Sequence, residues 1–412
     1  MIELQVHPQR CLLVGIDCDD YDCEQSLSEL HMLCETAGGE VVGSTSQRRD
    51  APDRATCVGT GKLSEISAFC DMNEINLVIF DVELSPVQMR NIEQVISCAI
   101  IDRTMLILDI FASRAKTADG KLQVELAQLK YRLPHLVGRG NAMSRLGGGI
   151  GTRGPGESKL ESDRRHIHRR IDALERELKA LEKRRDNMRS ARKENDLKTV
   201  ALVGYTNVGK STLLNKLTGA DVLSKDMLFA TLDPTTRSLV LSNGQTILIT
   251  DTVGFISRLP HQLISAFKST LEEAVYADLI LNVCDISSDQ RDDQLTVTTK
   301  LLSELGCVND KIVTVYNKCD KLTGGIAVDP NPKNIVISAY SGFGIDKLLA
   351  RIEDELCSTV RLKLAIPYDK LSVIGIIKQR GTIVSQEYTQ EGAELDAFVD
   401  KKDLHYVEEY IL

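Results

Sequence analysis

The residues best suited to chemistry form four short strings in the middle and second half of the chain. They are Gly204-Tyr205-Thr206-Asn207-Val208-Gly209-Lys210-Ser211, Asp251-Thr252-Val253-Gly254, Asn317-Lys318-Cys319-Asp320 and Ser338-Ala339. The first fits the pattern GxxxxGK[ST], in which backbone N–H groups surround a phosphate chain and a lysine adds positive charge. Together, their order and spacing predict a pocket for a guanine nucleotide and Mg²⁺.

Three residues besides Lys210 are expected to act on the metal and the terminal phosphate. Ser211 would supply a hydroxyl ligand to Mg²⁺. Asp251 ends the apolar run 245–250, so its carboxylate should lie at the carboxyl end of a strand and reach the ion through water. Gly254 would offer its backbone N–H to the γ-phosphate, an approach that a Cβ atom would hinder.

The string that begins at Asn317 predicts which base is bound. The carboxylate of Asp320 would accept hydrogen bonds from guanine N1–H and the exocyclic amine, and adenine has neither donor in that arrangement. Asn317 would brace the loop and touch the base, the stem of Lys318 would cover its face, and the Ala339 N–H would meet O6. Cys319 is interpreted as a variable position of this string, and ATP should bind poorly.

The elements around the strings are those that a phosphate loop requires. Residues 199–203 form a short apolar run that predicts a buried strand, and residues 211–217 have the leucine spacing of a helix. A glycine loop between strand and helix places the phosphates at the positive N-terminus of that helix. The run 311–316 predicts a further buried strand before Asn317.

A segment that senses the γ-phosphate should lie between the phosphate loop and Asp251. The best candidate is 228–237, where Thr231 is the expected second hydroxyl ligand of Mg²⁺. Thr235 and Thr236 remain competing ligands. Such a segment is expected to be ordered by GTP and released after hydrolysis.

Phe255 follows Gly254 at a position where a glutamine would orient the attacking water. Phenylalanine cannot do so, and intrinsic turnover should therefore be slow and depend on a partner that completes the site. Arg237 and Arg258 are alternative positive groups from the same chain. Asn207 has two possible roles: it holds K⁺ against the phosphates, as in potassium-activated GTPases, or it braces the loop.

Composition indicates a soluble, cytoplasmic protein of several domains. The 412 residues are 42% hydrophobic and 26% charged, which is enough apolar material for several cores. The sequence shows no membrane-spanning run and no signal-peptide pattern. The 11 cysteines lack CxxC pairs, which favours reduced thiols. The net charge of −9 argues against nonspecific nucleic-acid binding, and a monomer is the default expectation.

Residues 116–196 combine apolar stripes with dense positive charge. One stripe comprises Leu122, Leu126, Leu129 and Leu133, and the other comprises Ile167, Ile171, Leu174, Leu178, Leu181 and Met188, with Arg185 at one seam position. Both have coiled-coil spacing, which predicts an antiparallel helical hairpin. Its tip, 138–156, is rich in glycine and arginine. RNA contact is favoured over a merely solvated charged face because the tip and the basic helix share one hairpin.

The two ends of the chain predict further domains without assignable chemistry. Residues 1–115 alternate strand-like runs (12–16, 41–42, 77–80) with helical patterns (26–37, 62–71, 86–96), which indicates a small α/β domain with a parallel sheet. The glycine pair at 59–61 is interpreted as an ordinary turn. After 361, runs at 372–377 and 382–384 flank a turn at 379–381 in a small α+β appendage. The expected domains are 1–115, 116–196, 197–360 (the nucleotide-binding domain) and 361–412.

Longer strings outside these motifs resemble the HflX family of translational GTPases. They are 101–104 with 106–111, 120–129, 153–157, 228–235 and 251–256, together with the version Gly204-Tyr205-Thr206-Asn207 of the phosphate loop. The resemblance implies a Ras-like GTPase domain, a two-part N-terminal region and binding to the large ribosomal subunit. It also implies ribosome-stimulated hydrolysis of GTP to GDP and the separation of stalled or idle ribosomes into subunits.

By the same resemblance, GTP contacts fall on five strings and Mg²⁺ on Ser211 and Thr231. The added contact residues are Phe229, Ala230, Thr231, Leu232, Asp233 and Tyr340. Lys210, Thr231 and Gly254 are the expected catalytic residues. Two alternatives compete with ribosome splitting: an assembly factor for the large subunit, and a nucleotide switch that has only protein partners.

Overall fold

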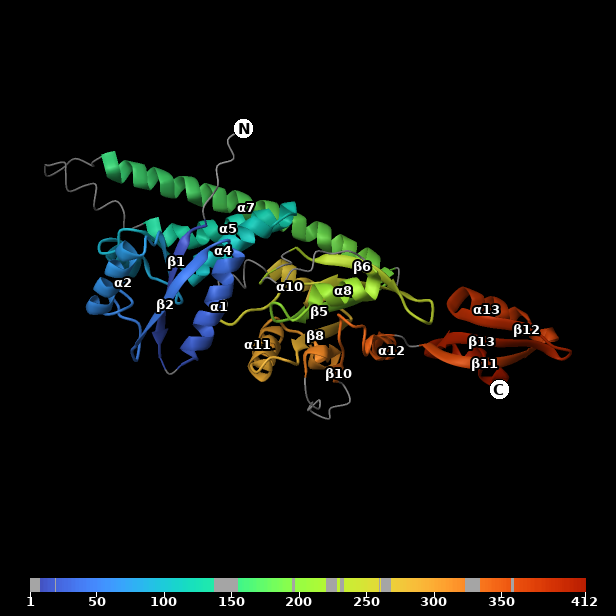
Figure 1. Cartoon of the computed structure of the whole chain (residues 1–412). Coiled ribbons are helices and arrows are strands. Elements are labelled where there is room, and N and C mark those ends of the chain that lie inside the picture. Colours follow the sequence, from blue (N-terminus) through green and yellow to red (C-terminus); the bar gives the residue numbers. More distant parts are fainter. Residues whose placement is uncertain are drawn as a thin grey trace, which may run out of the picture. The chain divides into compact units, whose positions relative to one another are not determined.

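The computed structural model describes residues 8–18, 20–136, 155–194, 197–219, 228–229, 233–258, 260, 268–322, 334–356 and 359–412. Figure 1 shows the whole chain. Packing divides it into two compact units, and each is described by itself. The first comprises Met1–Met188, Lys225–Asp233 and Val253–Leu271, and the second comprises Arg189–Ser224, Pro234–Thr252 and Glu272–Leu412.

The first unit begins with the predicted α/β arrangement. Four parallel strands lie in the order β2-β1-β3-β4, as the parallel-sheet prediction required. The strands are β1 (Arg10–Asp17), β2 (Glu40–Arg48), β3 (Leu77–Phe80) and β4 (Ala99–Asp102). The helices are α1 (Cys23–Thr36), α2 (Thr60–Met72), α3 (Pro86–Glu93) and α4 (Arg103–Arg114). The strand β4 and the helix α4 were not predicted.

Local sequence explains where these helices start. Ser85 caps α3 in a capping box with Gln88, and Pro86 occupies the first turn, where its missing N–H costs nothing. Gly59 precedes α2 without any side-chain cap, which is consistent with an ordinary turn. Asp102 both ends β4 and caps α4 by accepting from the Met105 N–H at 2.9 Å.

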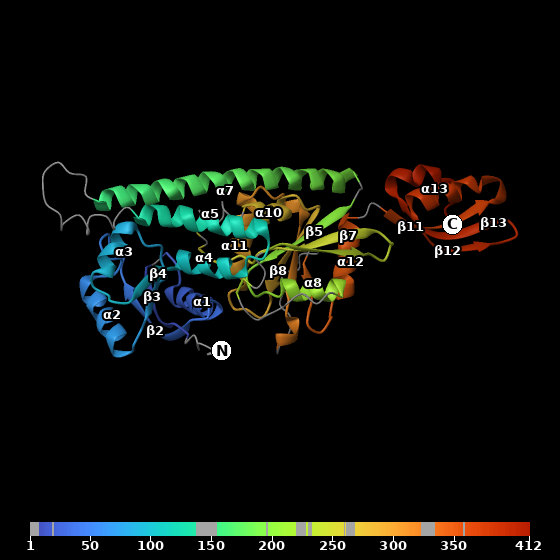
Figure 2. The ribbon, with the colours of Figure 1, turned by 90° about the horizontal axis from the view of Figure 1, so that it is seen from above.

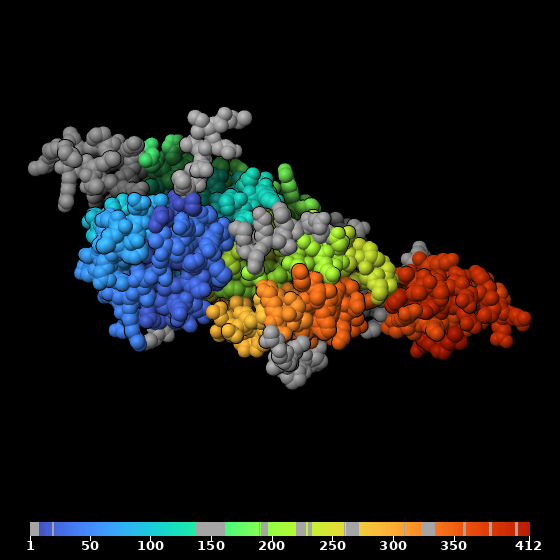
Figure 3. All heavy atoms as spheres, viewed as in Figure 1, coloured from blue at the N-terminus to red at the C-terminus, as the bar shows by residue number. Residues whose placement is uncertain are grey.

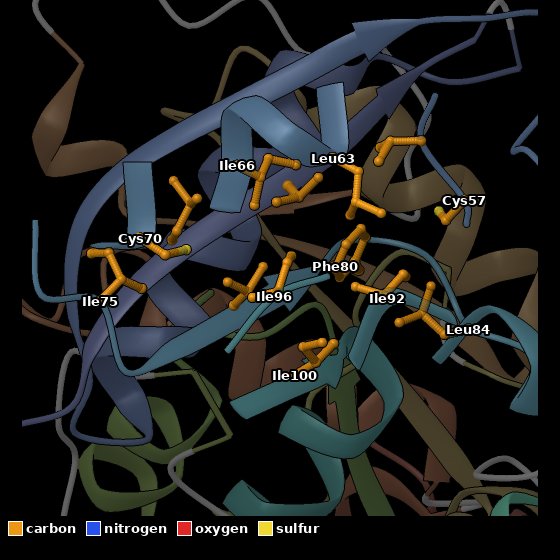
Figure 4. Packing of buried hydrophobic residues seen from close by; sticks show 14 of the residues in the cluster. Cys57, Leu63, Ile66, Cys70, Ile75, Phe80, Leu84, Ile92, Ile96 and Ile100 are labelled. Atoms are coloured by element: carbon orange, nitrogen blue, oxygen red, sulfur yellow. The ribbon is translucent and has the colours of Figure 1, made fainter. Parts of the chain in front are cut away.

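A continuous apolar core lies between α2, α3 and the sheet. Leu63 and Ile66 of α2 face Phe80 of β3, as Figure 4 shows, and Ile92 closes the same cluster from α3. All four side chains are almost completely buried. Figure 3 shows the surface atoms of these elements in blue. Burial of such side chains contributes about 1.5–3 kcal/mol each.

The helices α5 (Ala118–His135) and α7 (Pro155–Glu194) form the predicted antiparallel pair. They lie side by side in Figures 1 and 2. The stripes interdigitate through Leu126, Ile171 and Leu174, with Leu122, Leu129, Leu133, Ile167 and Leu178 packed against them. The seam residue Arg185 lies 3.7 Å from Asp119, which explains how a charge is accommodated there. The predicted tip lies largely outside the described residues, except that Pro155 and Gly156 belong to α7.

An ion cluster is buried between the sheet and α1. The guanidinium of Arg103 binds Glu29 of α1 and, at 2.9 Å, Asp81, and all three side chains are nearly inaccessible. The hydroxyl of Ser26 donates to Asp81 Oδ2 at 2.5 Å. Burial opposes the charge of Arg103, but the two carboxylates outweigh it and raise the pKa of the guanidinium above its ordinary value.

The second unit contains a six-stranded sheet in the order β10-β9-β8-β5-β7-β6. All neighbours are parallel except β6, which runs antiparallel to β7. The strands are β5 (Lys198–Gly204), β6 (Thr235–Val240), β7 (Thr246–Asp251), β8 (Leu279–Asp285), β9 (Ile312–Asn317) and β10 (Ile335–Val336). Its helices include α8 (Lys210–Thr218), α11 (Arg291–Glu304) and α12 (Ile345–Leu356), and α10 (Lys268–Val275) crosses the boundary between the units. This is the expected Ras-like arrangement.

The C-terminal elements of the second unit form a small antiparallel sheet in the order β11-β13-β12. The elements are β11 (Thr359–Pro367), α13 (Ser372–Arg380), β12 (Thr382–Tyr388) and β13 (Gly392–Asp400), red in Figure 1. Ile374 and Ile377 of α13 pack on Leu364 and Leu395. The α+β prediction is confirmed, but the predicted turn at 379–381 is wrong. The run 372–377 continues as a helix through Arg380, and Gly381 alone connects it to β12. Within the described ranges, no helix is both long and apolar enough to cross a membrane.

Replacing Arg103 with methionine should destabilise the protein by about 3–5 kcal/mol, because Glu29 and Asp81 would stay buried without their shared cation. Urea unfolding followed by circular dichroism measures this free energy. Arg170→Met is the matched control, since the Arg170–Glu125 pair is exposed and its loss should change stability little. Equal effects of the two substitutions would contradict a structural role for the buried cluster.

Candidate nucleotide-binding site

The carboxyl ends of the parallel strands gather the predicted strings at one edge of the second unit's sheet. The phosphate loop follows β5, Asp251 ends β7, Asn317 ends β9, and Ser338 follows β10 within two residues. Open α/β sheets bind their ligands at this edge. The strands therefore place motifs that are over a hundred residues apart in sequence at adjacent positions.

Two glycines of the phosphate loop are required by its geometry. Gly204 has φ 147° and Gly209 has φ 92°, both in the left-handed range that disfavours side chains. A Cβ atom at Gly204 would lie 2.1 Å from the carbonyl oxygen of Val283. At Gly209 it would lie 2.5 Å from Nδ2 of Asn317. The loop can pack against β8 and the Asn317 loop only because both positions lack a side chain.

Lys210 lies across this loop. Its Nζ donates to the carbonyl oxygens of Gly204, at 3.1 Å, and Tyr205, at 2.7 Å. Burial lowers the pKa of the amine to about 8, although Asp251 acts in the opposite direction. A negative phosphate chain beside the ammonium would favour its charged form, so nucleotide binding should raise this pKa again.

Binding of GTP near pH 8 should therefore take up protons, about half a proton per nucleotide if Lys210 is half protonated beforehand. Titration calorimetry in two buffers that differ in ionisation enthalpy measures this uptake. Near pH 6 the uptake by Lys210 should vanish, because the amine is charged in both states. Uptake that is absent at both pH values would contradict the lowered pKa.

Oxygen ligands suited to Mg²⁺ lie beside the loop. The hydroxyl of Ser211 donates to Asp251 Oδ2 at 2.6 Å, and Asp251 is completely buried at the end of β7. A hydroxyl paired with a carboxylate fits the oxygen preference of this ion. Among the residues that the structure describes, no three His, Cys, Asp or Glu side chains cluster as a metal site.

The competing hydroxyl ligands are engaged in the sheet. Thr236 Oγ1 lies 2.9 Å from Thr250 Oγ1, and Thr235 pairs with Asp251 in the ladder between β6 and β7. Thr231, the preferred ligand, lies outside the described residues, as do Ala230 and Leu232. Its role stays a prediction.

Asn317 connects the phosphate loop to the base-binding strings. Its Nδ2 donates to the Val208 carbonyl oxygen at 2.8 Å, and its Oδ1 accepts from the Ala339 N–H at 2.9 Å. The side chain is 2% exposed, so both bonds are shielded from water. One amide therefore fixes the phosphate loop and the Ala339 loop relative to each other.

Lys318 adds a second connection to the phosphate loop. Its Nζ donates to the Asn207 carbonyl oxygen at 2.7 Å and pairs with Asp285 at 2.8 Å. Both Asn207 and Lys318 have positive φ, which these contacts maintain. Asp320 accepts a hydrogen bond from Ser338, which orients the carboxylate predicted to select guanine. Tyr340 is exposed beside this loop.

Two further predicted contact residues, Phe229 and Asp233, lie in the first unit, whereas Thr252 belongs to the second. Phe229 packs edge to face on Phe111, with ring centroids 4.7 Å apart. Asp233 accepts from the backbone N–H groups of Lys116, at 2.7 Å, and Thr117, at 2.9 Å, at the start of α5. Sequence reasoning missed this second role of Asp233. Thr117 could have been recognised as a helix cap, but no sequence pattern reveals its distant partner.

The segment after Asp251 also belongs to the first unit from Val253 onward. Gly254 and Phe255 are both buried there. Arg258, one candidate positive group, donates to both the carbonyl and the carboxylate oxygen of Asp81 at 2.6 Å. Arg237, the other, is exposed and donates to the carbonyl oxygen of Thr236 at 3.0 Å.

The phosphate loop, the strand-end aspartate Asp251 and the string 317–320 lie at one edge of the sheet. This combination defines a GTP-binding protein of the P-loop class. Three family models match the chain: "GTP-binding GTPase N-terminal" over 24–112, "GTP-binding GTPase Middle Region" over 114–192 and "50S ribosome-binding GTPase" over 199–318. The GTPase HflX of Caldanaerobacter subterraneus is 50% identical over 400 residues, covering 97% of this chain and 93% of that protein. The GTPase HflX of Escherichia coli is 42% identical, covering 83% and 81%.

The chain belongs to the HflX family of GTPases, and it hydrolyses GTP. The family resemblance noted in its sequence is thereby confirmed. Among solved structures, it is similar to a GTP-binding protein from the archaeon Sulfolobus solfataricus in complex with GDP. That match has 25% identity and a TM-score of 0.45, and covers 84% of this chain and 98% of that one.

Proposed function

We propose that this GTPase binds the large ribosomal subunit and splits stalled or idle ribosomes into subunits in the cytoplasm. The observation that carries the proposal is the combination, in one chain, of a guanine-nucleotide site and a long helical hairpin with a basic surface. The exposed basic residues of α7 include Arg164, Arg169, Arg176, Lys179, Lys183 and Arg184. The match to a family model described as a 50S ribosome-binding GTPase supports the same partner.

In this proposal GTP occupies the loop edge of the second unit's sheet. Lys210 and the backbone of 204–211 hold the phosphates, and the Asp320 carboxylate selects the base. Ser211, with Asp251 through water and Thr231 as a further ligand, would hold Mg²⁺. When bound there, Mg²⁺ would supply positive charge beside the phosphate oxygens. Asn207 remains available for K⁺, with its backbone already held by Lys318.

The buried Phe255 explains why a ribosome would be needed for rapid turnover. Its ring can neither donate nor accept a hydrogen bond, so it cannot orient the attacking water. A missing positioning or positive group in such sites costs roughly 10³–10⁵ in rate. We infer that ribosomal groups complete the site after the hairpin has docked, and that basic residues of α7 contact the RNA phosphates.

Sedimentation of intact ribosomes with the protein and a nonhydrolysable GTP analogue tests the proposal. Free subunits should accumulate, because binding of the GTP-bound protein would compete with subunit association. Protein that sediments with the large subunit while leaving ribosomes intact would instead identify an assembly factor. Protein that sediments with neither intact ribosomes nor subunits would instead favour a nucleotide switch that has only protein partners.

A variant lacking 138–154 tests whether the hairpin tip docks on the ribosome. It retains the first turn of α7 and all residues of the second unit. Ribosome-stimulated hydrolysis should be lost, while the affinity for GTP should be unchanged. Stimulation that survives this deletion would contradict docking through the hairpin tip.

A further inference from the structure

The segment that follows the Asp251–Gly254 string is held by buried charges of the N-terminal elements. Residues Val253–Leu271 belong to the first unit, and its described part includes Phe255, Ile256, Ser257 and Arg258. Phe255 and Ile256 are buried among apolar residues. The polar contacts come from the next two residues.

Arg258 is held from several directions. Its Nη2 donates to Asp81 Oδ2 and to the Asp81 carbonyl oxygen, each at 2.6 Å. Its guanidinium carbon lies 3.9 Å from the centre of the Tyr21 ring, which is a cation–π distance. The Tyr21 hydroxyl is fixed in turn by donating to the Ile16 carbonyl oxygen at 2.8 Å. Asp81 is fully buried, so its bonds to Arg258 are poorly screened by water.

Ser257 connects the same segment to the other acid of the cluster. Its hydroxyl donates to Glu29 Oε2 at 2.6 Å, and its carbonyl oxygen accepts from Arg103 Nη2 at 3.2 Å. Arg103 itself bridges Glu29 and Asp81. The segment is therefore part of one hydrogen-bonded network with β3, α1 and α4, whose members are mostly buried.

The backbone at Arg258 shows that these contacts determine its conformation. Arg258 has φ 52°, in the left-handed range that a non-glycine residue adopts only at a cost in free energy. Such a conformation persists where surrounding contacts over-determine it. Here, the contacts of Arg258 with Asp81 and Tyr21, and the contact of the preceding Ser257 with Glu29, supply that constraint.

We propose that Arg258 is a positioning residue for GTP hydrolysis, acting through Asp81 and Tyr21 rather than through the phosphates. It fixes the end of the segment that begins at Gly254. Because Phe255 cannot orient a water, catalysis depends on how accurately the backbone of this segment is held. Phosphoryl transfer is governed by positioning, and a misplacement of about 1 Å can cost roughly a hundredfold in rate.

The proposal rests on the GTPase activity and not on the ribosome, so intrinsic turnover tests it. Single-turnover hydrolysis by the full chain should fall about tenfold to a hundredfold in Arg258→Ala. Affinity for GDP, which lacks the γ-phosphate, should stay unchanged, because the phosphate and base loops are untouched. Arg258→Lys should recover part of the rate, since an ammonium can still pair with Asp81. Arg361→Ala is the matched control: it breaks an arginine–aspartate pair, with Asp396 at 2.7 Å, in the C-terminal elements and should leave the rate unchanged.

Asp81→Asn and Tyr21→Leu distinguish positioning from direct action of the arginine on phosphate. Both leave Arg258 in place, and both should lower the single-turnover rate without changing the affinity for GDP. The double variant Asp81→Asn with Arg258→Ala should be no slower than the slower single variant. Thermal unfolding checks that each variant is folded, and Tyr21→Leu preserves the buried ion cluster if Asp81→Asn does not fold. An unchanged or faster rate in Arg258→Ala, or normal rates in both Asp81→Asn and Tyr21→Leu, would overturn the proposal.

Discussion

The side chain of Asn317 holds two loops of the candidate nucleotide site together. Its amide joins Val208 of the phosphate loop to Ala339 of the base-binding loop, through two hydrogen bonds shielded from water. A carboxylate could not donate to the Val208 carbonyl, and a shorter hydroxyl could not span both partners. The absence of a Cβ atom at Gly209 leaves room for this amide. The loop predicted to hold the phosphates and the loop predicted to hold the base are therefore joined through one residue at the end of β9.

The elements around the candidate site produce a positive electrostatic potential that favours an anion. Five strands end at the same edge, and the helix α8 begins there with its positive end toward the phosphate loop. Lys210 is buried where its charge is disfavoured, and a bound phosphate chain would offset that cost. The segments that contain Asp233 and Arg258, by contrast, make their contacts with α5, β3 and α1 of the first unit. The loops predicted to recognise the nucleotide and the segments that contain Asp233 and Arg258 are thus held by different parts of the chain.

Sequence reasoning succeeded where local chemistry determines structure. Glycine spacing indicated the phosphate loop, and apolar runs indicated the buried strands around it. Leucine spacing indicated the helices α5 and α7. It failed at α4, because Leu106, Ile107 and Leu108 are all buried and leave no amphipathic periodicity to recognise. It failed at α13, where the β-branched run 372–377 resembles a strand but packs one face on β11 and β13. The contacts of Asp233 and Arg258 join residues over a hundred positions apart, and no local pattern specifies them.

The central claim is that the strings joined by Asn317 form a pocket selective for guanine. Titration calorimetry of the full chain with GTP and with ATP, in the presence of Mg²⁺, measures this selectivity directly. We expect ATP to bind at least about a hundredfold more weakly, because adenine would leave the Asp320 carboxylate without its donors. Equal affinities for GTP and ATP would contradict the account.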